Sequence, residues 1–194
     1  PANVLVASEQ LAQVVVLRSD TLAQIDSHAY PSELTGATLA SLSLALGPDD
    51  DSPNGNDAFL AAVKNDGTIA DPDLSGAVYR LDSSGASEGQ TLIPGSDPEL
   101  TAPLDIAFDA SGRVYVIDMA ADGQTYRLLR YLVGGSGTAS FESELISPRS
   151  HEWAPSGGRV RIQFFKEPAD ETGAQWLQLT DPHAGTVETY VIPD

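Results

Sequence analysis

The feature that most constrains this chain is a repeated unit: an apolar strand, a polar turn, a second apolar strand, another turn and a third strand. The second strands of four such units begin at Val4, Phe59, Val114 and Trp176. Successive copies are therefore 55, 55 and 62 residues apart. Units of antiparallel strands at so even a spacing predict a modular array built almost entirely of β-structure.

The clearest copy shows how each unit is built. In its first strand Leu104, Ile106 and Phe108 alternate with smaller or polar residues, and Ser111-Gly112 then makes a turn before the second strand. A period of two places one apolar face inward, and it also fixes the register of pairing. The Gly-containing turns are typical of hairpin loops that need positive φ.

The sequence predicts an all-β fold, a β-propeller or partial propeller of four-stranded antiparallel blades. Residues 1–194 form one domain, whose units span approximately 1–35, 36–98, 99–148 and 149–194. The first unit lacks an opening strand, and the last ends after its third strand. Two arrangements remain open: a ring of about four blades, at the lower end of the usual range, or an arc of a larger ring. An arc leaves open sheet edges that something else must cover, and the unequal end units favour it.

The segment 103–118 resembles a blade of the NHL-type and related six-bladed propellers. In those blades a proline is followed by an apolar residue, by an apolar residue with Ala, and by an Asp. A turn that contains Gly comes next, and a strand with the pattern Tyr-Val-x-Asp follows it. The resemblance implies the fold. Blades of this kind serve binding proteins, lactonases and lyases alike, so it implies no single activity.

Charge excludes one class of partner. The chain has 28 acidic and 10 basic residues, a net charge of −18. Nucleic acid is not expected to bind, because phosphate contacts need basic patches. Cations and basic proteins suit the negative field better. No apolar run approaches the roughly 20 residues that span a bilayer, so direct membrane insertion is not expected.

Composition also bears on location. Without cysteine the chain has no disulfide, thiolate metal site or cysteine nucleophile. It starts at Pro1 and shows no signal segment, so we expect a processed chain or a piece of a longer one. An acidic, cysteine-free β protein suits an extracytoplasmic location, periplasmic or secreted.

The most polar loop, residues 49–57, is the candidate metal site. Its candidate Ca²⁺ ligands are Asp50, Ser52, Asn54 and Asp57. The first of these occupy alternate positions of an EF-hand-like loop, with Gly55 at the sixth position. The twelfth position is Ala61 rather than the bidentate Glu such a loop requires. A solvated hairpin loop is the alternative interpretation.

Catalytic motifs give little support for an enzyme. The three histidines lie in unrelated loops, and no Gly-x-Ser-x-Gly elbow, Walker loop, Rossmann fingerprint or His-Glu-x-x-His occurs. Lactonase-type propellers gather carboxylates around a central ion, and Asp20, Asp105 and Asp118 are the candidates for that role. The alternative is that these carboxylates cap turns.

Aromatic residues supply the candidate partner contacts. Trp153 and His151 lie in the loop 150–155, where a Trp side chain suits an interface. Trp176 stands on an alternating strand, and we expect it to pack in the core.

These patterns together favour a non-catalytic binding or scaffold subunit that docks onto a partner protein or a membrane complex outside the cytoplasm. No cofactor is expected, with Ca²⁺ the one candidate ion. The alternatives are a Ca²⁺-dependent propeller hydrolase of the lactonase type and a calcium-dependent adhesion module.

Overall fold

The computed structural model describes residues 3–8, 13–34, 36–47, 57–81, 87–134, 137–151, 159–165 and 175–192. These residues form fourteen strands and one short 3-10 helix, Ser32–Leu34. The strands are β1 Asn3–Ser8, β2 Gln13–Arg18, β3 Gln24–Ala29, β4 Leu39–Leu46, β5 Ala58–Asn65, β6 Leu74–Leu81, β7 Ser87–Ile93, β8 Ala102–Phe108, β9 Val114–Met119, β10 Thr125–Val133, β11 Ala139–Ser150, β12 Arg161–Phe165, β13 Gln175–Asp181 and β14 Thr186–Ile192. Within this described part of the chain, no helix has the length and apolarity to cross a membrane.

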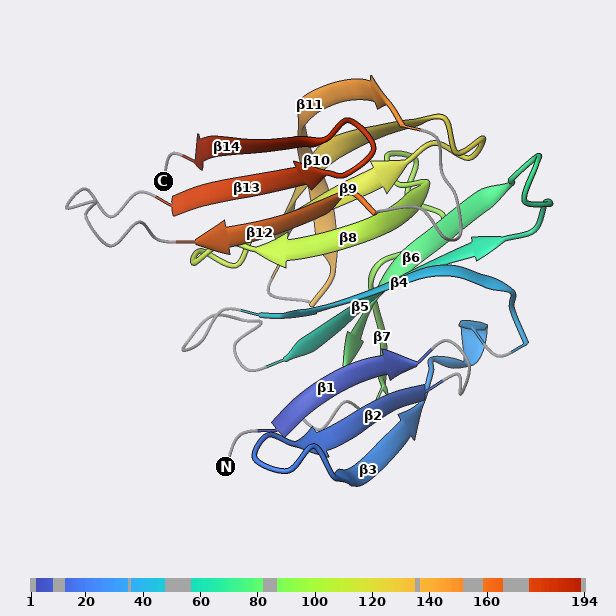
Figure 1. Cartoon of the computed structure of the whole chain (residues 1–194), viewed down its shortest axis with the longest axis vertical. Helices are drawn as coiled ribbons and strands as arrows, with labels where there is room; N and C mark the ends of the chain where they lie inside the picture. Colours follow the sequence, from blue (N-terminus) through green and yellow to red (C-terminus); the bar gives the residue numbers. More distant parts are fainter. Residues whose placement is uncertain are drawn as a thin grey trace.

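The strands form four antiparallel sheets that follow one another as blades (Figure 1). The first blade is β1-β2-β3, the second β4 to β7, the third β8 to β11, and the fourth β12-β13-β14. Each blade is completed before the chain begins the next, as hairpin connections favour. The predicted all-β fold of antiparallel, propeller-like blades is confirmed. Its two middle blades have four strands, and its two outer blades have three among the described residues.

The opening strands of three blades lie beside one another. Strand β4 contacts β8, and β8 contacts β12, while β1 of the first blade contacts β4. These four strands define the axis of the arc, and the later strands of each blade lie progressively farther from it.

The middle blades are buried on both faces, which differs from the one-sided burial that the alternation predicted. In β9, Val114 and Val116 pack toward the second blade, whereas Tyr115, Ile117 and Met119 pack toward the fourth. All six residues of β9 are buried. A blade between two others has no solvent face, so both sets of alternating side chains enter a core.

Aromatic pairs mark the packing between blades. The rings of Phe59 and Phe108 join the second and third blades, with centroids 4.5 Å apart. The rings of Tyr115 and Phe164 join the third and fourth in an edge-on contact at 4.8 Å. Such geometries add to the apolar area that aromatic side chains bury.

One local detail agrees with the predicted strands and one differs from them. The turn glycine Gly112 has φ +82°, as the hairpin pattern predicted. Strand β11 runs over twelve residues, whereas the sequence indicated only a short segment near residues 139–141. It is an exposed outer strand that pairs with β10 through three register shifts, so its polar residues show no simple alternation.

Trp176 does not pack in the core as expected. Leu177 and Leu179 of the same strand are buried, so the alternation of β13 places Trp176 on the opposite, open face of the fourth blade. There its ring stacks on Phe165 with centroids 6.5 Å apart.

Candidate functional site

A cavity of about 510 Å³ lies at the axis, and we call it the axial groove. It lies between β1, β4, β8 and β12, the strands that converge there. Its apolar wall includes Leu5, Leu44 and Ile106, and its polar wall includes Ser43, Asp105 and Arg161. A concave site with a few polar groups among apolar ones is the usual form of a binding site.

Asp105 holds the polar wall together. Its side chain is 5% exposed and accepts hydrogen bonds from the Ser43 hydroxyl, from the Ile162 backbone N–H at 2.8 Å and from Arg161 Nη1 at 3.1 Å. These donors come from the second and fourth blades. One carboxylate therefore ties three blades together, and its oxygens are occupied by protein donors.

A second cavity of about 320 Å³ adjoins the axial groove, and we call it the lateral groove. It is lined by apolar side chains of β1 and β4 and by Ala58, and it shares Leu5 and Leu44 with the axial groove. The exposed Val4 and Leu46 lie on its walls. The two grooves thus follow the space between β1 and β4.

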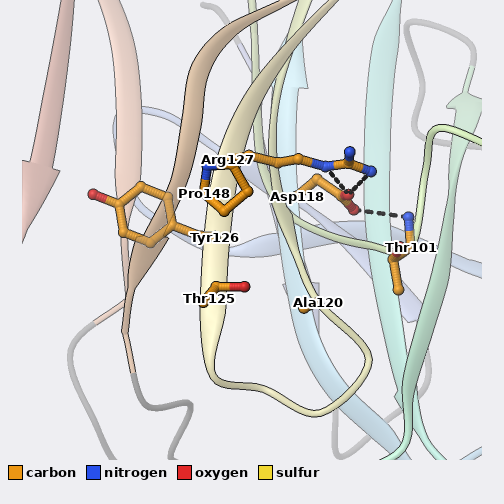
Figure 2. Close-up of a pocket in the computed structure, with 7 residues that line it drawn as sticks. All are labelled: Thr101, Asp118, Ala120, Thr125, Tyr126, Arg127 and Pro148. Carbon is orange, nitrogen blue, oxygen red and sulfur yellow. Dashed lines mark hydrogen bonds and ion pairs between the residues drawn. The ribbon is translucent and has the colours of Figure 1, made fainter.

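A third, smaller cavity of about 190 Å³ lies over the third blade, around Asp118 (Figure 2). The Asp118 side chain accepts hydrogen bonds from the backbone N–H groups of Thr101 at 2.8 Å and Ala102 at 2.7 Å. It also pairs with the guanidinium of Arg127, whose Nε and Nη2 lie 3.2 and 3.1 Å from Oδ2. Arg127 donates a further hydrogen bond to the carbonyl of Glu99.

The electrostatics of Asp118 fit a structural role. Burial raises the pKa of this carboxyl above its ordinary value, while the two backbone hydrogen bonds and Arg127 lower it. The carboxylate is costly to bury and is held in place by four donors. It anchors the turn before β8 to the end of β9.

A buried pair lies between the third and fourth blades. Asp181 accepts hydrogen bonds from the backbone N–H groups of His183 at 3.0 Å and Ala184 at 3.1 Å, and its Oδ1 lies 3.3 Å from His151 Nδ1. Burial by itself raises the pKa of Asp181, but these hydrogen bonds, His151 and the Tyr126 hydroxyl together bring it below its ordinary value.

The structure describes one of the two predicted partner-contact residues, His151. His151 is 4% exposed, and its ring packs edge-on against Tyr126 and His183. In this structure its side chain faces the interior. Trp153 lies outside the described residues. The partner contact at this loop stays a prediction.

The predicted Ca²⁺ site also stays a prediction. Asp50, Ser52 and Asn54 lie outside the described residues. Asp57 is described, and its carboxylate accepts a hydrogen bond from Arg80 Nε at 2.8 Å. In the parts of the chain that the structure describes, no three His, Asp or Glu side chains are grouped closely enough to hold a metal ion.

The lactonase-type candidates are not brought together. Asp105 faces the axis, Asp118 binds the turn before β8, and Asp20 lies in an exposed turn after β2. Arg161 was not predicted as a site residue from the sequence. Its side chain is 48% exposed beside Asp105 and lines the axial groove. Its position on an alternating opening strand was the available signal, since Arg161 lies between the apolar residues Val160 and Ile162.

Fold and site thus define a propeller-like protein with a groove at its axis. No protein-family model matches the chain, and no curated protein matches it. The resemblance to NHL-type blades therefore stays a resemblance. Among solved structures, the chain is similar to hydrazine synthase of Kuenenia stuttgartiensis, with a TM-score of 0.47 and 13% sequence identity. The match covers 92% of this chain and 40% of that chain.

Proposed function

We propose that this protein is a non-catalytic binding module that docks a partner protein in the axial and lateral grooves. The observation that carries the proposal is the location of these grooves: they lie at the axis beside β1, a strand that pairs with β2 alone among the described strands. An edge strand beside an apolar groove offers backbone and side-chain contacts to another chain.

The buried carboxylates support a binding role over a catalytic one. Asp105, Asp109, Asp118 and Asp181 each accept hydrogen bonds from the backbone or side chains of this protein. Carboxylates occupied in this way stabilise turns and blade contacts. They serve the structure of the blades around the groove.

The partner's charge follows from the net charge of −18. A strongly negative protein attracts basic partners over long range and raises their association rate at low salt. A basic segment of a protein or membrane complex outside the cytoplasm fits this proposal. The apolar walls of the grooves would supply contacts that salt does not screen.

Selection of displayed random peptides on the purified protein tests the proposal. The variant is Leu46→Arg, because Leu46 is 69% exposed and lines the lateral groove. The matched control is Val187→Arg. Val187 is 62% exposed on β14, which belongs to the fourth blade and not to the blades that form the lateral groove. We expect enriched peptides to bind the wild type and Val187→Arg equally and to lose roughly tenfold or more in affinity for Leu46→Arg.

Two further measurements complete the test. Thermal unfolding of both variants verifies that each retains the fold. Affinities measured at low and high salt should show weaker binding of the enriched peptides at high salt. Enriched peptides that bind Leu46→Arg as tightly as the wild type, or a selection that enriches none, would contradict the proposal.

A further inference from the structure

We propose that the outer contact between the third and fourth blades is an acid-sensitive clasp, which holds the two blades together near neutral pH and releases the outer edge of the fourth blade in acid. This inference goes beyond the proposed docking function and does not depend on it. Every group that it uses lies in these two blades, on β10, β11, β13 and β14 or in the turns next to them.

The first attachment is made by the end of β11. In the middle of this strand, Glu142 pairs with Arg130 of its own blade at 3.0 Å. Farther along, Arg149 reaches β14 of the fourth blade, where its Nη1 lies 2.8 Å from both carboxylate oxygens of Glu188. Its Nη2 also donates a hydrogen bond to the Tyr190 hydroxyl at 3.1 Å, and that hydroxyl is hydrogen-bonded to Glu188. The last part of β11 is therefore fixed to the neighbouring blade.

The second attachment is made by the residue that follows β11. His151 is 4% exposed, and its Nδ1 lies 3.3 Å from Oδ1 of Asp181 at the end of β13. Its ring packs edge-on against Tyr126 of β10 and against His183 in the turn after β13. The clasp thus consists of two carboxylates on the fourth blade, Asp181 and Glu188, and of their partners on the third blade, Tyr126, Arg149 and His151.

The clasp lies at one end of an interface whose other end is held separately. Near the axis, Asp105 of the third blade accepts hydrogen bonds from the Ile162 N–H and from Arg161 of the fourth. Between the two ends the contact is apolar and includes the rings of Tyr115 and Phe164. Loss of the clasp should therefore loosen β14 and the end of β13, while β12 stays attached at the axis.

The surroundings of the two carboxylates favour their ionised forms. The hydroxyl of Tyr190 and the guanidinium of Arg149 lower the pKa of Glu188 below its ordinary value. Burial raises the pKa of Asp181, but its hydrogen bonds and His151 bring it below the ordinary value. The titratable and charged groups that face these carboxylates, besides each other, are Tyr126 on β10, Arg149 and His151 at the end of β11, His183 in the turn after β13, and Tyr190 on β14.

These two directions determine how the clasp responds to pH. A carboxyl whose pKa is lowered by folding stabilises the folded state above its unfolded pKa of about 4, and this contribution is lost as pH falls through the folded pKa. Asp181 and Glu188 shift in the same direction. Acid therefore weakens both attachments of the clasp, whereas at neutral pH their contribution is complete.

Hydrogen exchange of the backbone amides in the full chain, measured between about pH 6 and about pH 3, tests the clasp. The rates are expressed as protection factors, which removes the intrinsic effect of pH on exchange. We expect the β14 amides to lose roughly tenfold or more in protection across this range, while the amides of β5 and β9 keep theirs. Unchanged protection of β14 would overturn the proposal, and so would an equal loss in all three strands, since that is global unfolding.

Two isosteric variants identify the groups responsible. Glu188→Gln and Asp181→Asn keep an acceptor oxygen but no longer titrate, so each should reduce the pH dependence of β14 protection. The matched control is Glu142→Gln: Glu142 is 33% exposed and Glu188 34%, and both pair with an arginine, but Glu142 pairs within its own blade. The control should keep the pH dependence of the wild type. If Asp181→Asn does not fold, Glu188→Gln decides alone, and a pH dependence as large as that of the wild type overturns the clasp.

Removal of the partner on the third blade gives an independent measurement. Arg149→Gln should lower the protection of the β14 amides already at about pH 6, toward the value of the wild type in acid, and acid should then lower it little further. Arg130→Gln, which removes the partner of Glu142, is the matched control and should leave β14 as in the wild type. Full protection of β14 in Arg149→Gln at this pH would overturn the proposal, because the end of β11 would then not hold the fourth blade.

Discussion

The third and fourth blades share a strand plan but bury it differently. In the third blade every residue of β8 and β9 is buried, because another blade covers each face. In the fourth blade Leu177, Leu179 and Ile162 enter the core, whereas the residues between them face outward. The same alternation therefore produces a two-sided core in one blade and a one-sided core in the other.

The open face of the fourth blade still has the composition of a packing surface. Three cross-strand rows run across it: Arg161-Thr180-Val187, Gln163-Gln178-Thr189 and Phe165-Trp176-Val191. Only Arg161 among these nine residues carries a charge, on a chain with 28 acidic residues. Neighbouring blades, and not the sequence of a strand alone, decide which of its two faces is a core.

Removing an aromatic ring from each kind of blade should give the largest contrast. Phe59 is 0% exposed and packs against Phe108 between two blades, whereas Phe165 is 37% exposed on the open face. We expect Phe59→Ala to lower the free energy of unfolding by about 3–5 kcal/mol through the cavity it leaves. Phe165→Ala should cost less than about 1 kcal/mol, because the ring lies on a partly exposed face and its removal leaves no enclosed cavity.

Denaturant unfolding of the two variants measures this difference, with the slope of unfolding free energy against denaturant as a check on two-state behaviour. Equal losses for the two variants would contradict the contrast between a two-sided and a one-sided core.

A smaller effect is expected at the buried carboxylate of the third blade. Asp118→Ala removes the acceptor for the Thr101 and Ala102 N–H groups and leaves Arg127 without this carboxylate. We expect a loss of roughly 2–4 kcal/mol, below the largest values for broken buried pairs, because burying the Asp118 charge is itself costly.

The control for Asp118 is Asp26→Ala in the first blade. The Asp26 side chain is 63% exposed and lies 3.6 Å from His28. It should change the free energy of unfolding by less than about 0.5 kcal/mol. If Asp26→Ala lowers the free energy of unfolding as much as Asp118→Ala does, the burial of a carboxylate does not determine the cost of removing it.

Much of the strand plan was predictable from the sequence, because alternation and turn residues are local signals. The second and third strands of all four units lie where the pattern predicted them. The ion-pair partners of individual side chains were not predictable. Arg80 lies opposite Phe59 and pairs with Asp57, whereas Arg127 lies opposite Asp118 and pairs with it.

The site was predictable only in outline. The sequence predicted the strands that line the grooves, because the alternation in β1, β4, β8 and β12 is a local signal. It did not show that Asp105 would join Ser43 and Arg161, which are 62 and 56 residues away along the chain. Such contacts depend on how blades are placed around the axis, and no short pattern of residues encodes that placement.

The contact between blades at the axis offers a moderate test. Ser43→Ala removes one donor to Asp105 and keeps the Ile162 N–H and Arg161 bonds. We expect a loss of about 1–2 kcal/mol in unfolding free energy. Ser140→Ala on the exposed strand β11 is the matched control, and its change should be within about 0.5 kcal/mol. Equal stability of Ser43→Ala and the wild type would show that Asp105 does not link the second blade to the third.

The last expected effect is the dependence of stability on alkaline pH. Burial is the largest cause that raises the pKa of Tyr115 to about 12, and the nearby Asp109 raises it further. Burial likewise raises the pKa of Tyr126 to about 12. In the unfolded chain a tyrosine ionises near about pH 10. A group whose folded pKa is raised contributes its stability fully below the unfolded pKa and loses it as pH rises through the folded pKa.

The free energy of unfolding should therefore fall as pH rises from about 10 to 12, when both phenols are forced to ionise in the buried middle of the arc. Tyr115→Phe removes one of these groups and should make the fall shallower. Absorbance titration of tyrosinate in the folded protein, together with unfolding measured across the same pH range, checks both statements. Exposed tyrosines in the unfolded protein serve as the internal reference, and a Tyr115→Phe protein with an unchanged slope would show that the third blade does not hold this phenol in its protonated form.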